Sequence, residues 1–208
     1  MTDAGLMIYN DQNRIQIDSR YKNLCLDSKS TGKLFRHTLE GIHAFNLENG
    51  FFDIRCFANI SNECYYATQT DVTDYYFNWN VPAASSGLEV YNSQNERVFS
   101  SNSKPLRVLD FVSLDVNSLI LGSVCYSKSY NASKIAIIPS QIPYNFRRDG
   151  HYILLDSFSF LMSGGSLEVS YKQVMHLYAY KGSSAISAAS SASFQPYGNF
   201  LVIDISHY

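Results

Sequence analysis

The sequence predicts an all-β protein, built as one or more antiparallel β-sandwiches with little or no helix, and three observations lead to this prediction. Short runs alternate apolar and polar residues, the pattern that places every second side chain on one face of a strand. Turn-forming clusters separate these runs at intervals of about 8 to 12 residues, which is typical of sandwiches and barrels. Charged residues make up only 16% of the chain, whereas Tyr, which favours strands, occurs 16 times.

The alternation assigns individual strands. The alternating sets are Phe52, Ile54 and Cys56; Tyr75, Phe77 and Trp79; Phe158, Phe160 and Met162; and Leu167, Val169 and Tyr171. Residues 174–180 are apolar on both faces, which predicts a strand buried on two sides, and residues 199–205 predict a final β-branched strand. Turns are expected at residues 10–13, 47–50, 61–63, 92–95, 148–150 and 163–165.

One sequence unit occurs twice. Residues 5–13 (GLMIYNDQN) return as residues 87–95 (GLEVYNSQN), and nine of the 22 positions from 5 to 26 are identical at the constant offset of 82. Each copy predicts a strand, a polar turn rich in asparagine, which tolerates left-handed backbone, and a return strand. The duplication implies either two β-lobes, 1–81 and 82–208, or one intertwined sandwich containing a duplicated hairpin or meander. Residues 82–86 form a short linker-like break.

The bulk composition excludes two classes of partner. The net charge is −2 and the isoelectric point about 6.2, so the chain has no electrostatic footprint for nucleic acid. No apolar run approaches the roughly 18 residues that span a bilayer, and the first residues do not form a signal peptide. We therefore expect synthesis in a cytoplasm.

The chain carries no recognisable catalytic or metal-binding motif. Residues 28–34 contain the Gly-Lys pair of a phosphate loop, but Asp27 and Leu34 stand where that loop needs Gly and Ser or Thr. The five histidines are scattered, without the spacing of metal ligands. We expect a protein that is not an enzyme and that needs no cofactor or metal.

The four cysteines form no C-x-x-C pair and are predicted to be buried thiols. Cys25 in particular is expected to pack in an apolar strand, whereas a bridge between Cys56 and Cys64 across a hairpin is the alternative for those two residues.

Aromatic and loop residues are the remaining candidates for partner contact. Tyr75, Phe77 and Trp79 are expected to occupy a core face, although the same cluster could form a stacking platform. The Ser/Ala-rich residues 182–193 are expected to form an exposed loop, and a partner-contacting loop is the alternative. The candidate contact residues are Tyr65, Tyr66, Tyr76, Phe194 and Tyr197.

The second repeat copy and its flanks resemble a known family. Trp79 and Pro82 precede the string Gly-Leu-Glu-Val-Tyr-Asn at 87–92, and Val-Phe-Ser-Ser follows at 98–101. With the opening Ala-Gly-Leu-Met-Ile-Tyr-Asn at 4–10 and the apolar end at 200–205, this resembles small β-rich proteins encoded among the tail and tail-fibre genes of tailed bacteriophages. The family usually has a turn Gly where Asn13 and Asn95 stand, and an Asp where Ser100 stands.

The resemblance implies a structural or interaction protein of a tailed-phage virion, at the tail tip or the fibre attachment region. Its implied partners are other tail proteins, in a symmetric multimer with several copies per particle. The alternative is a receptor- or glycan-binding module exposed at the tail end, with a host surface receptor as its partner.

Overall fold

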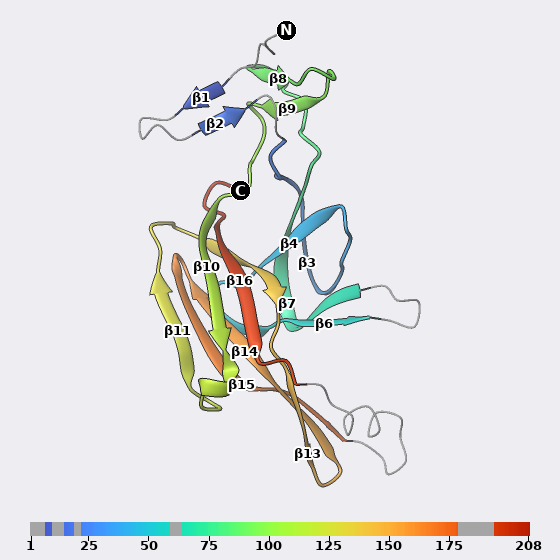
Figure 1. Ribbon diagram of the computed structural model, residues 1–208, viewed down its shortest axis with the longest axis vertical. Helices are drawn as coiled ribbons and strands as arrows, with labels where there is room; N and C mark the ends of the chain where they lie inside the picture. Colours follow the sequence, from blue (N-terminus) through green and yellow to red (C-terminus); the bar gives the residue numbers. More distant parts are fainter. Residues whose placement is uncertain (1–6, 10–14, 19–21, 59–63, 179–193) are drawn as a thin grey trace.

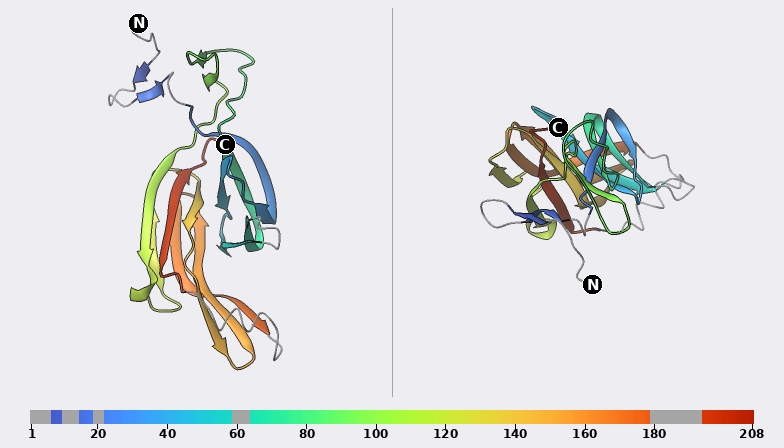
Figure 2. Two further views of the ribbon diagram at one scale, coloured as in Figure 1. Left: turned by 45° about the vertical axis from the view of Figure 1, so that its right-hand side comes forward. Right: turned by 90° about the horizontal axis from the view of Figure 1, so that it is seen from above.

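The structure is a computed structural model that describes residues 7–9, 15–18, 22–58, 64–178 and 194–208. It is all-β, as the sequence predicts: every strand ladder is antiparallel, and the only helical element in the described part is the single 3-10 turn η1 (Val116–Ser118). Two sheets stack into a sandwich, and two small hairpins lie beyond one end of it (Figures 1 and 2).

The larger sheet takes strands from both halves of the chain. Its order is β10 (Val108–Asp115), β16 (Tyr197–Asp204), β12 (Ile135–Gln141), β4 (Gly41–Asn46), β7 (Cys64–Asn78) and β3 (Cys25–Arg36), and β6 (Arg55–Ala58) also pairs with β7. Strands from residues 1–81 and from residues 82–208 therefore share one sheet, joined where β4 pairs with β12.

The smaller sheet comes from the second half of the chain. Its order is β11 (Val124–Ser129), β15 (Ser166–Tyr178), β14 (Tyr152–Ser163) and β13 (Asn145–Asp149). The short strand β5 (Gly50–Asp53) lies beside β14, so the first half of the chain also contacts this sheet.

The main core fills the space between the two sheets. Phe52 of β5 packs on Phe160 of β14, with ring centroids 5.6 Å apart, and Phe200 of β16 meets Phe160 edge-on at 5.4 Å. All three side chains are at most 2% exposed, and burying each stabilises the fold by about 1.5–3 kcal/mol. The inward positions follow the period-2 alternation, since Phe158 and Met162 are fully buried as well.

A second apolar cluster covers the outer face of the larger sheet near the hairpin end. It gathers Phe77 of β7, Ala136 of β12 and Ile203 of β16, all fully buried. Leu24 and Leu106, from the segments that lead away from the hairpins, pack over this face. The sheet is thus buried on both faces here, which anchors those two segments.

The two hairpins confirm the duplicated unit residue by residue. β1 (Met7–Tyr9) pairs with β2 (Ile15–Asp18), and β8 (Glu89–Tyr91) pairs with β9 (Arg97–Ser100). Ile8 lies opposite Ile17 in the first ladder, as their equivalents Val90 and Phe99 do in the second. The irregularity in register also falls at equivalent positions, after Ile8 and after Val90. We call the two hairpins together the hairpin unit.

The two repeat copies meet again beneath the hairpins. Residues 22–26 and 104–108 run antiparallel, with Leu26 N donating to Lys104 O at 2.9 Å and Leu106 N to Leu24 O at 2.8 Å. Cys25 lies opposite Pro105, so Leu24 lies opposite Leu106, its equivalent in the repeat. The two segments are therefore paired antiparallel and centred on one pair of equivalent residues. We call this pair of segments the neck.

Two expectations about individual strands are wrong. Trp79 does not continue the core face of Tyr75 and Phe77, because β7 ends at Asn78 and the chain turns toward the hairpins; its side chain is 52% exposed. Residues 174–178 are not buried on two sides either. Val174 is buried, but His176 and Tyr178 are exposed where β15 extends past the sandwich.

The described turns agree with the sequence, but only one of the two described thiols does, because Cys125 is half-buried and not buried as predicted. Asn49 and Asn95 adopt φ of 57° and 62°, as left-handed turn residues do. Cys25 is 1% exposed, which confirms a packing thiol. The expected turns at 10–13 and 61–63 and the loop at 182–193 lie outside the described residues, as do the side chains of Cys56 and Cys64.

Candidate functional site

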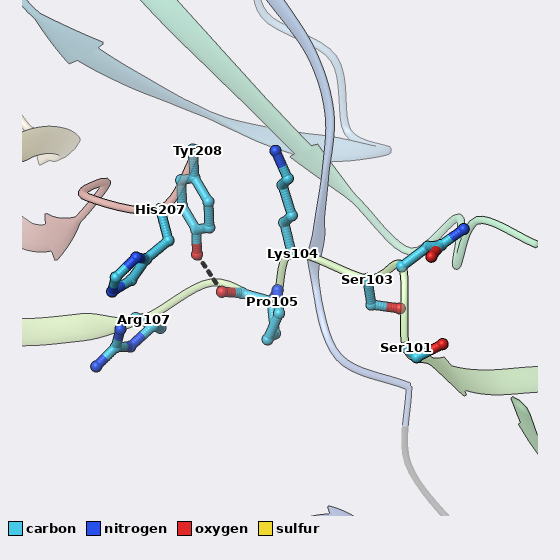
Figure 3. Close-up of a pocket in the computed structure, with 8 residues that line it drawn as sticks. Ser101, Ser103, Lys104, Pro105, Arg107, His207 and Tyr208 are labelled. Carbon is cyan, nitrogen blue, oxygen red and sulfur yellow. Dashed lines mark hydrogen bonds between the residues drawn. The ribbon is translucent and has the colours of Figure 1, made fainter. Parts of the chain in front are cut away.

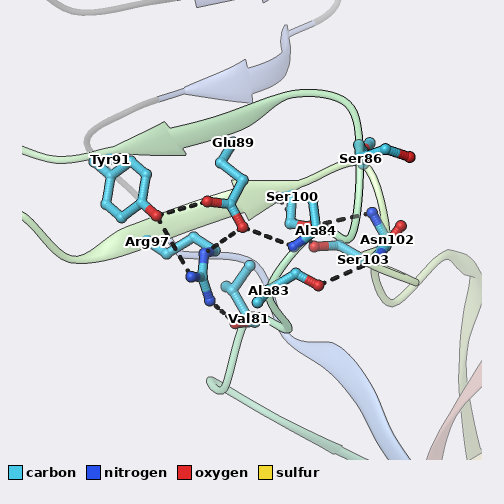
Figure 4. A network of polar contacts seen from close by, with 11 residues as sticks. Val81, Ala83, Ala84, Ser86, Glu89, Tyr91, Arg97, Ser100, Asn102 and Ser103 are labelled. Carbon is cyan, nitrogen blue, oxygen red and sulfur yellow. Dashed lines mark hydrogen bonds and ion pairs between the residues drawn. The ribbon is translucent and has the colours of Figure 1, made fainter.

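The hairpin end of the molecule is the candidate site, and the second hairpin is its best-defined part. Glu89 Oε1 forms an ion pair with Arg97 Nε at 3.0 Å, and Tyr91 OH donates to Glu89 Oε2 at 2.6 Å (Figure 4). The same two charged side chains also hold the segment that connects β7 to the second hairpin. Ala84 N donates to Glu89 Oε1, and Arg97 Nη1 donates to Val81 O. The network therefore fixes the second hairpin to the strand-to-hairpin connector.

This network is specific to the second copy. The positions equivalent to Glu89 and Arg97 are Met7 and Ile15, which cannot form an ion pair. The hydrogen bonds lower the pKa of the Glu89 carboxyl, chiefly through Tyr91, so the carboxylate is charged at neutral pH. The two copies therefore share the residues that set the shape of the hairpin backbone. The side chains that form the polar network in the second copy are different residues in the first.

An asparagine organises the turn of the second hairpin. Asn92 Oδ1 accepts from Gln94 N at 3.0 Å and from Glu96 N at 2.8 Å, an Asx arrangement that closes the loop. Glu96 also lies 3.4 Å from the ammonium of Lys22, at the start of the neck segment of the first copy. This ion pair links the two repeat copies.

The second hairpin has almost no core of its own. Val90 and Val98 are buried against Phe99, whereas Leu88 and Tyr91 are 45% and 43% exposed. A two-stranded hairpin is marginally stable by itself in water. Its order here depends on the polar network and on the neck.

A pocket of about 440 Å³ opens between the neck and the end of the chain (Figure 3). We call it the neck pocket. Its lining residues are Ser101, Asn102, Ser103, Lys104, Pro105, Arg107, His207 and Tyr208. Tyr208 OH donates to Pro105 O, and the Tyr208 ring meets Phe77 of the apolar cluster beneath at a centroid distance of 5.6 Å.

Positive charge collects around this pocket. Arg107 Nη1 forms an ion pair with Asp204 Oδ2 at 3.1 Å, but the arginine side chain is 54% exposed. Lys29 lies on the neighbouring strand β3, with its ammonium 5.3 Å from the centroid of the Tyr75 ring. The pKa of Lys29 is lowered, first by burial and then by the charges of Lys104 and Lys134.

The buried carboxylate of Asp204, beside the neck pocket, already has hydrogen-bond and ion-pair partners. Burial alone would raise the pKa of Asp204, but hydrogen bonds from Ser206 and the charge of Arg107 outweigh it, so that pKa is lowered. Asp204 Oδ1 accepts from Ser206 N at 2.9 Å. The carboxylate is 6% exposed and faces inward, leaving the basic side chains at the surface.

The predicted contact tyrosines are only partly brought together. Tyr66 and Tyr76 flank the buried His43, with ring centroids 5.8 Å and 4.9 Å from the imidazole. Both tyrosines are half-buried, as is Tyr65 beside them on β7, so they do not form an open platform. Tyr76 OH shares a hydrogen bond of 3.0 Å with Thr38 Oγ1.

The other two predicted contact residues lie elsewhere. Phe194 and Tyr197 are 46% and 49% exposed and lie at or just before the start of β16, at the end of the sandwich away from the hairpins (Figure 1).

A sharp irregularity in the β3–β7 ladder explains the aromatic cluster. The register jumps from Gly32 opposite Val72 to Leu34 opposite Ala67, so β7 carries four residues where β3 carries one. The far part of the pair folds back, and Tyr66 reaches the ring of Phe45 at 5.4 Å. The alternation of apolar and polar residues could not predict this bend, because a bulge interrupts the alternation without changing the amino-acid composition of the strand.

Beneath these rings lies a polar pair that the sequence did not predict. His43 Nδ1 and Asp74 Oδ2 are 2.9 Å apart, and their side chains are 8% and 4% exposed. His43 Nε2 and Asp74 Oδ1 have no hydrogen-bond partner among the described protein atoms. The two residues lie on neighbouring strands but 31 positions apart in sequence, so no local motif marks them.

The described thiols are protonated at neutral pH. Burial raises the pKa of Cys25, and burial raises the pKa of Cys125 to about 11. The described residues include no group of three or more His, Cys, Asp or Glu side chains placed to hold a metal ion. Within the same residues, no helix has the length and apolar character needed to cross a membrane.

A separate aromatic surface lies at the opposite end of the molecule, where β14 begins and β15 ends. The Tyr152 ring lies tilted against His176 at a centroid distance of 4.3 Å and meets Tyr178 edge-on at 5.4 Å, and His151 lies 6.0 Å from Tyr178. All four side chains are exposed. We call this group the distal patch.

Comparison with family models, with curated proteins and with solved structures finds no match to this chain.

Proposed function

We propose that this chain is a structural and interaction protein of a tailed-phage virion, located at the tail tip or the fibre attachment region. The observation that carries the proposal is the hairpin unit: a duplicated element, held on a neck outside a well-packed sandwich, whose second hairpin has almost no core. Such an element gains order by packing against a neighbour, and a subunit of an assembly provides one.

Two further features support the proposal. The repeat that builds the hairpin unit is the segment that resembles phage tail and tail-fibre proteins. The sparse charge also suits a surface covered by neighbouring subunits, where a buried charge would be costly to desolvate. The partners are then other tail proteins, and the protein occurs in several symmetric copies because tails are symmetric.

The test is mass spectrometry of phage particles purified by density gradient. We expect peptides of this chain to co-purify with the tail proteins at a constant ratio through successive gradients. Their absence from particles, while the chain is present in the infected-cell lysate, would overturn the proposal in favour of a protein made during infection but not packaged.

The distal patch favours a second candidate, a receptor- or glycan-binding module exposed at the tail end. Exposed Tyr and His rings present flat apolar faces beside polar edges, the chemistry that binds sugars and varied protein surfaces. Binding of purified protein to host cells, compared between the native chain and Tyr152→Ala, separates the two candidates. Equal binding of both proteins, or no binding, removes this candidate.

A further inference from the structure

We propose that β10 is a docking edge at which the chain pairs with a second copy of itself, antiparallel and about a two-fold axis through Phe111. The larger sheets of the two copies would then join into one continuous sheet. This inference goes beyond the virion proposal and does not depend on it. It rests on the open edge of β10, on an apolar row that ends there, and on the charges at the two ends of the strand.

The outer edge of β10 is open in the described structure. β10 pairs with β16 on one side, and no described strand pairs with its other side (Figure 1). An unpaired edge presents a row of N–H and C=O groups with which another strand can form a ladder. At eight residues, β10 is long enough to pair along its whole length with a strand of ordinary size.

The protection that the other sheet edges carry is missing from β10. Proteins commonly block an exposed edge with charged side chains, Lys above all. The other three edge strands of the two sheets each carry Lys or Arg: Lys29 and Lys33 in β3, Lys128 in β11, and Arg147 and Arg148 in β13. β10 (VLDFVSLD) contains no Lys, Arg or Pro, so it is the edge least protected against pairing.

The two features of β10 that oppose pairing are confined to its first residues. Asp110 forms an ion pair with Lys128 Nζ at 2.7 Å and accepts from Tyr126 OH at 3.0 Å, so its charge is already compensated. The bulge lies between Val108 and Asp110, whereas residues 111–115 pair with β16 in an uninterrupted register. The second part of the strand therefore presents a regular edge.

An apolar row crosses the outer face of the larger sheet and ends at this edge. Ile138 of β12 lies opposite Leu201 of β16, and Leu201 lies opposite Phe111 of β10. Exposure increases along the row, because Ile138 is 5% exposed, Leu201 is half-buried and Phe111 is 59% exposed. A strand added beyond β10 would cover the Phe111 ring, and Phe111 of a second copy would supply the matching apolar side chain.

The charges at the two ends of β10 favour a second copy as the occupant. Asp115 ends the strand, Arg107 immediately precedes it, and both side chains are exposed. Both lie four positions from Phe111, so an antiparallel pair centred on Phe111 brings each Arg107 beside the Asp115 of the other copy. One nitrogen of Arg107 faces Asp204, and the guanidinium has further N–H donors for a second carboxylate.

A strand of another protein would have to carry these charges in the right order, whereas a second copy supplies them by symmetry. Each copy has one such edge, so the pairing closes at a dimer.

The first test is analytical ultracentrifugation of the full chain over a range of concentrations, in which we expect a reversible equilibrium between monomer and dimer. Phe111→Lys should raise the dissociation constant of the dimer at least about tenfold, because it removes the central apolar contact and places two ammonium groups directly opposite each other. Leu34→Lys is the matched control, since Leu34 is 58% exposed on the edge strand β3, which already carries Lys29 and Lys33. Circular dichroism of each variant verifies that the fold is retained.

Oxidative cross-linking tests the register of the pair. Residues directly opposite each other have Cβ atoms about 4.5–5.5 Å apart, so Phe111→Cys should form a disulfide between the two copies. Ser113→Cys is the control on the same strand, because the two copies of that position would lie about 13 Å apart, beyond the reach of a disulfide. The native chain, oxidised in the same way, accounts for its own four cysteines.

A chain that stays monomeric at every concentration would overturn the proposal, and so would equal weakening of the dimer by Phe111→Lys and Leu34→Lys. Cross-linking of Ser113→Cys that equals or exceeds that of Phe111→Cys would overturn the pairing centred on Phe111. None of these results bears on whether the chain is packaged in particles.

Discussion

Replacing Phe52 with Ala tests whether the two halves of the chain share one core. Phe52 comes from the first half and is 2% exposed, and its ring packs on Phe160 of the second half at 5.6 Å. Removing a fully buried phenyl ring costs about 3–5 kcal/mol, from lost transfer free energy and the cavity left behind. Because whole domains unfold at about 5–15 kcal/mol, this single change should remove a large fraction of the stability.

Phe51→Ala is the matched control, since the neighbouring residue points the other way. Its ring is 48% exposed and contacts only the Lys172 ammonium among the described cations, 4.1 Å from the ring centroid. A cation–π contact at an exposed site contributes about 0.5–1 kcal/mol, and the partly buried ring adds some apolar contact, so this variant should lose about 1 kcal/mol.

Urea unfolding followed by far-UV circular dichroism gives both values. With a slope of about 2–3 kcal/mol per M, Phe52→Ala should lower the midpoint by about 1–2 M and Phe51→Ala by less than about 0.5 M. Equal shifts would refute the sandwich packing of β5 against β14. A biphasic transition in Phe52→Ala alone would show that the halves unfold separately.

Three further predictions follow from particular contacts. Gly41→Ala should destabilise the protein by about 1–3 kcal/mol in the same urea assay, because a Cβ there would lie 2.4 Å from Phe77 O. Glu89→Gln should speed limited proteolysis of the hairpin connector while leaving the thermal midpoint of the sandwich unchanged; a lowered midpoint would contradict a local role. The Lys128 hydrogen bond lowers the pKa of Asp110, so this carboxylate stabilises the fold above its ordinary pKa of 3.8 and the contribution disappears as pH falls through the lowered value. Asp110→Asn should therefore flatten the dependence of stability on pH below about 4, and an unchanged slope would contradict this.

The strands and hairpins were predictable where a local pattern, such as the alternation of apolar and polar residues, is enough to define them. Phe158, Phe160 and Met162 alternate and all lie in the main core, because successive side chains of a strand point to opposite faces, and the small Ser157 and Ser159 between them are buried on the other face. The repeat predicted two hairpins, and they share one register because the same turn residues set the same pairing.

Strand partners could not be predicted in the same way. The larger sheet joins β4 to β12 across about ninety residues of chain, and such pairings depend on the packing of the whole core. The end of β15 was predicted to be buried on both faces, and this prediction was wrong. His176 and Tyr178 continue an apolar run, yet the second sheet does not extend over them, so they are exposed.

The candidate sites were harder to predict than the fold. The neck pocket combines Lys104 and Arg107 with His207, about one hundred positions later, and the sequence carries no spacing that would link them. Tyr66 and Tyr76 were predicted as contact residues, but both lie against His43 and are half-buried. Tyr76 lies opposite His43 in the β4–β7 ladder, and Tyr66 lies beyond the bulge in the β3–β7 ladder.

The most direct test of the virion proposal is a cryo-electron microscopy reconstruction of the phage tail. We expect density for symmetry-related copies of the sandwich at the tail tip or the fibre attachment region, with each hairpin unit packed against a neighbouring subunit. A complete reconstruction of the tail in which every density is accounted for by other proteins would contradict the proposal.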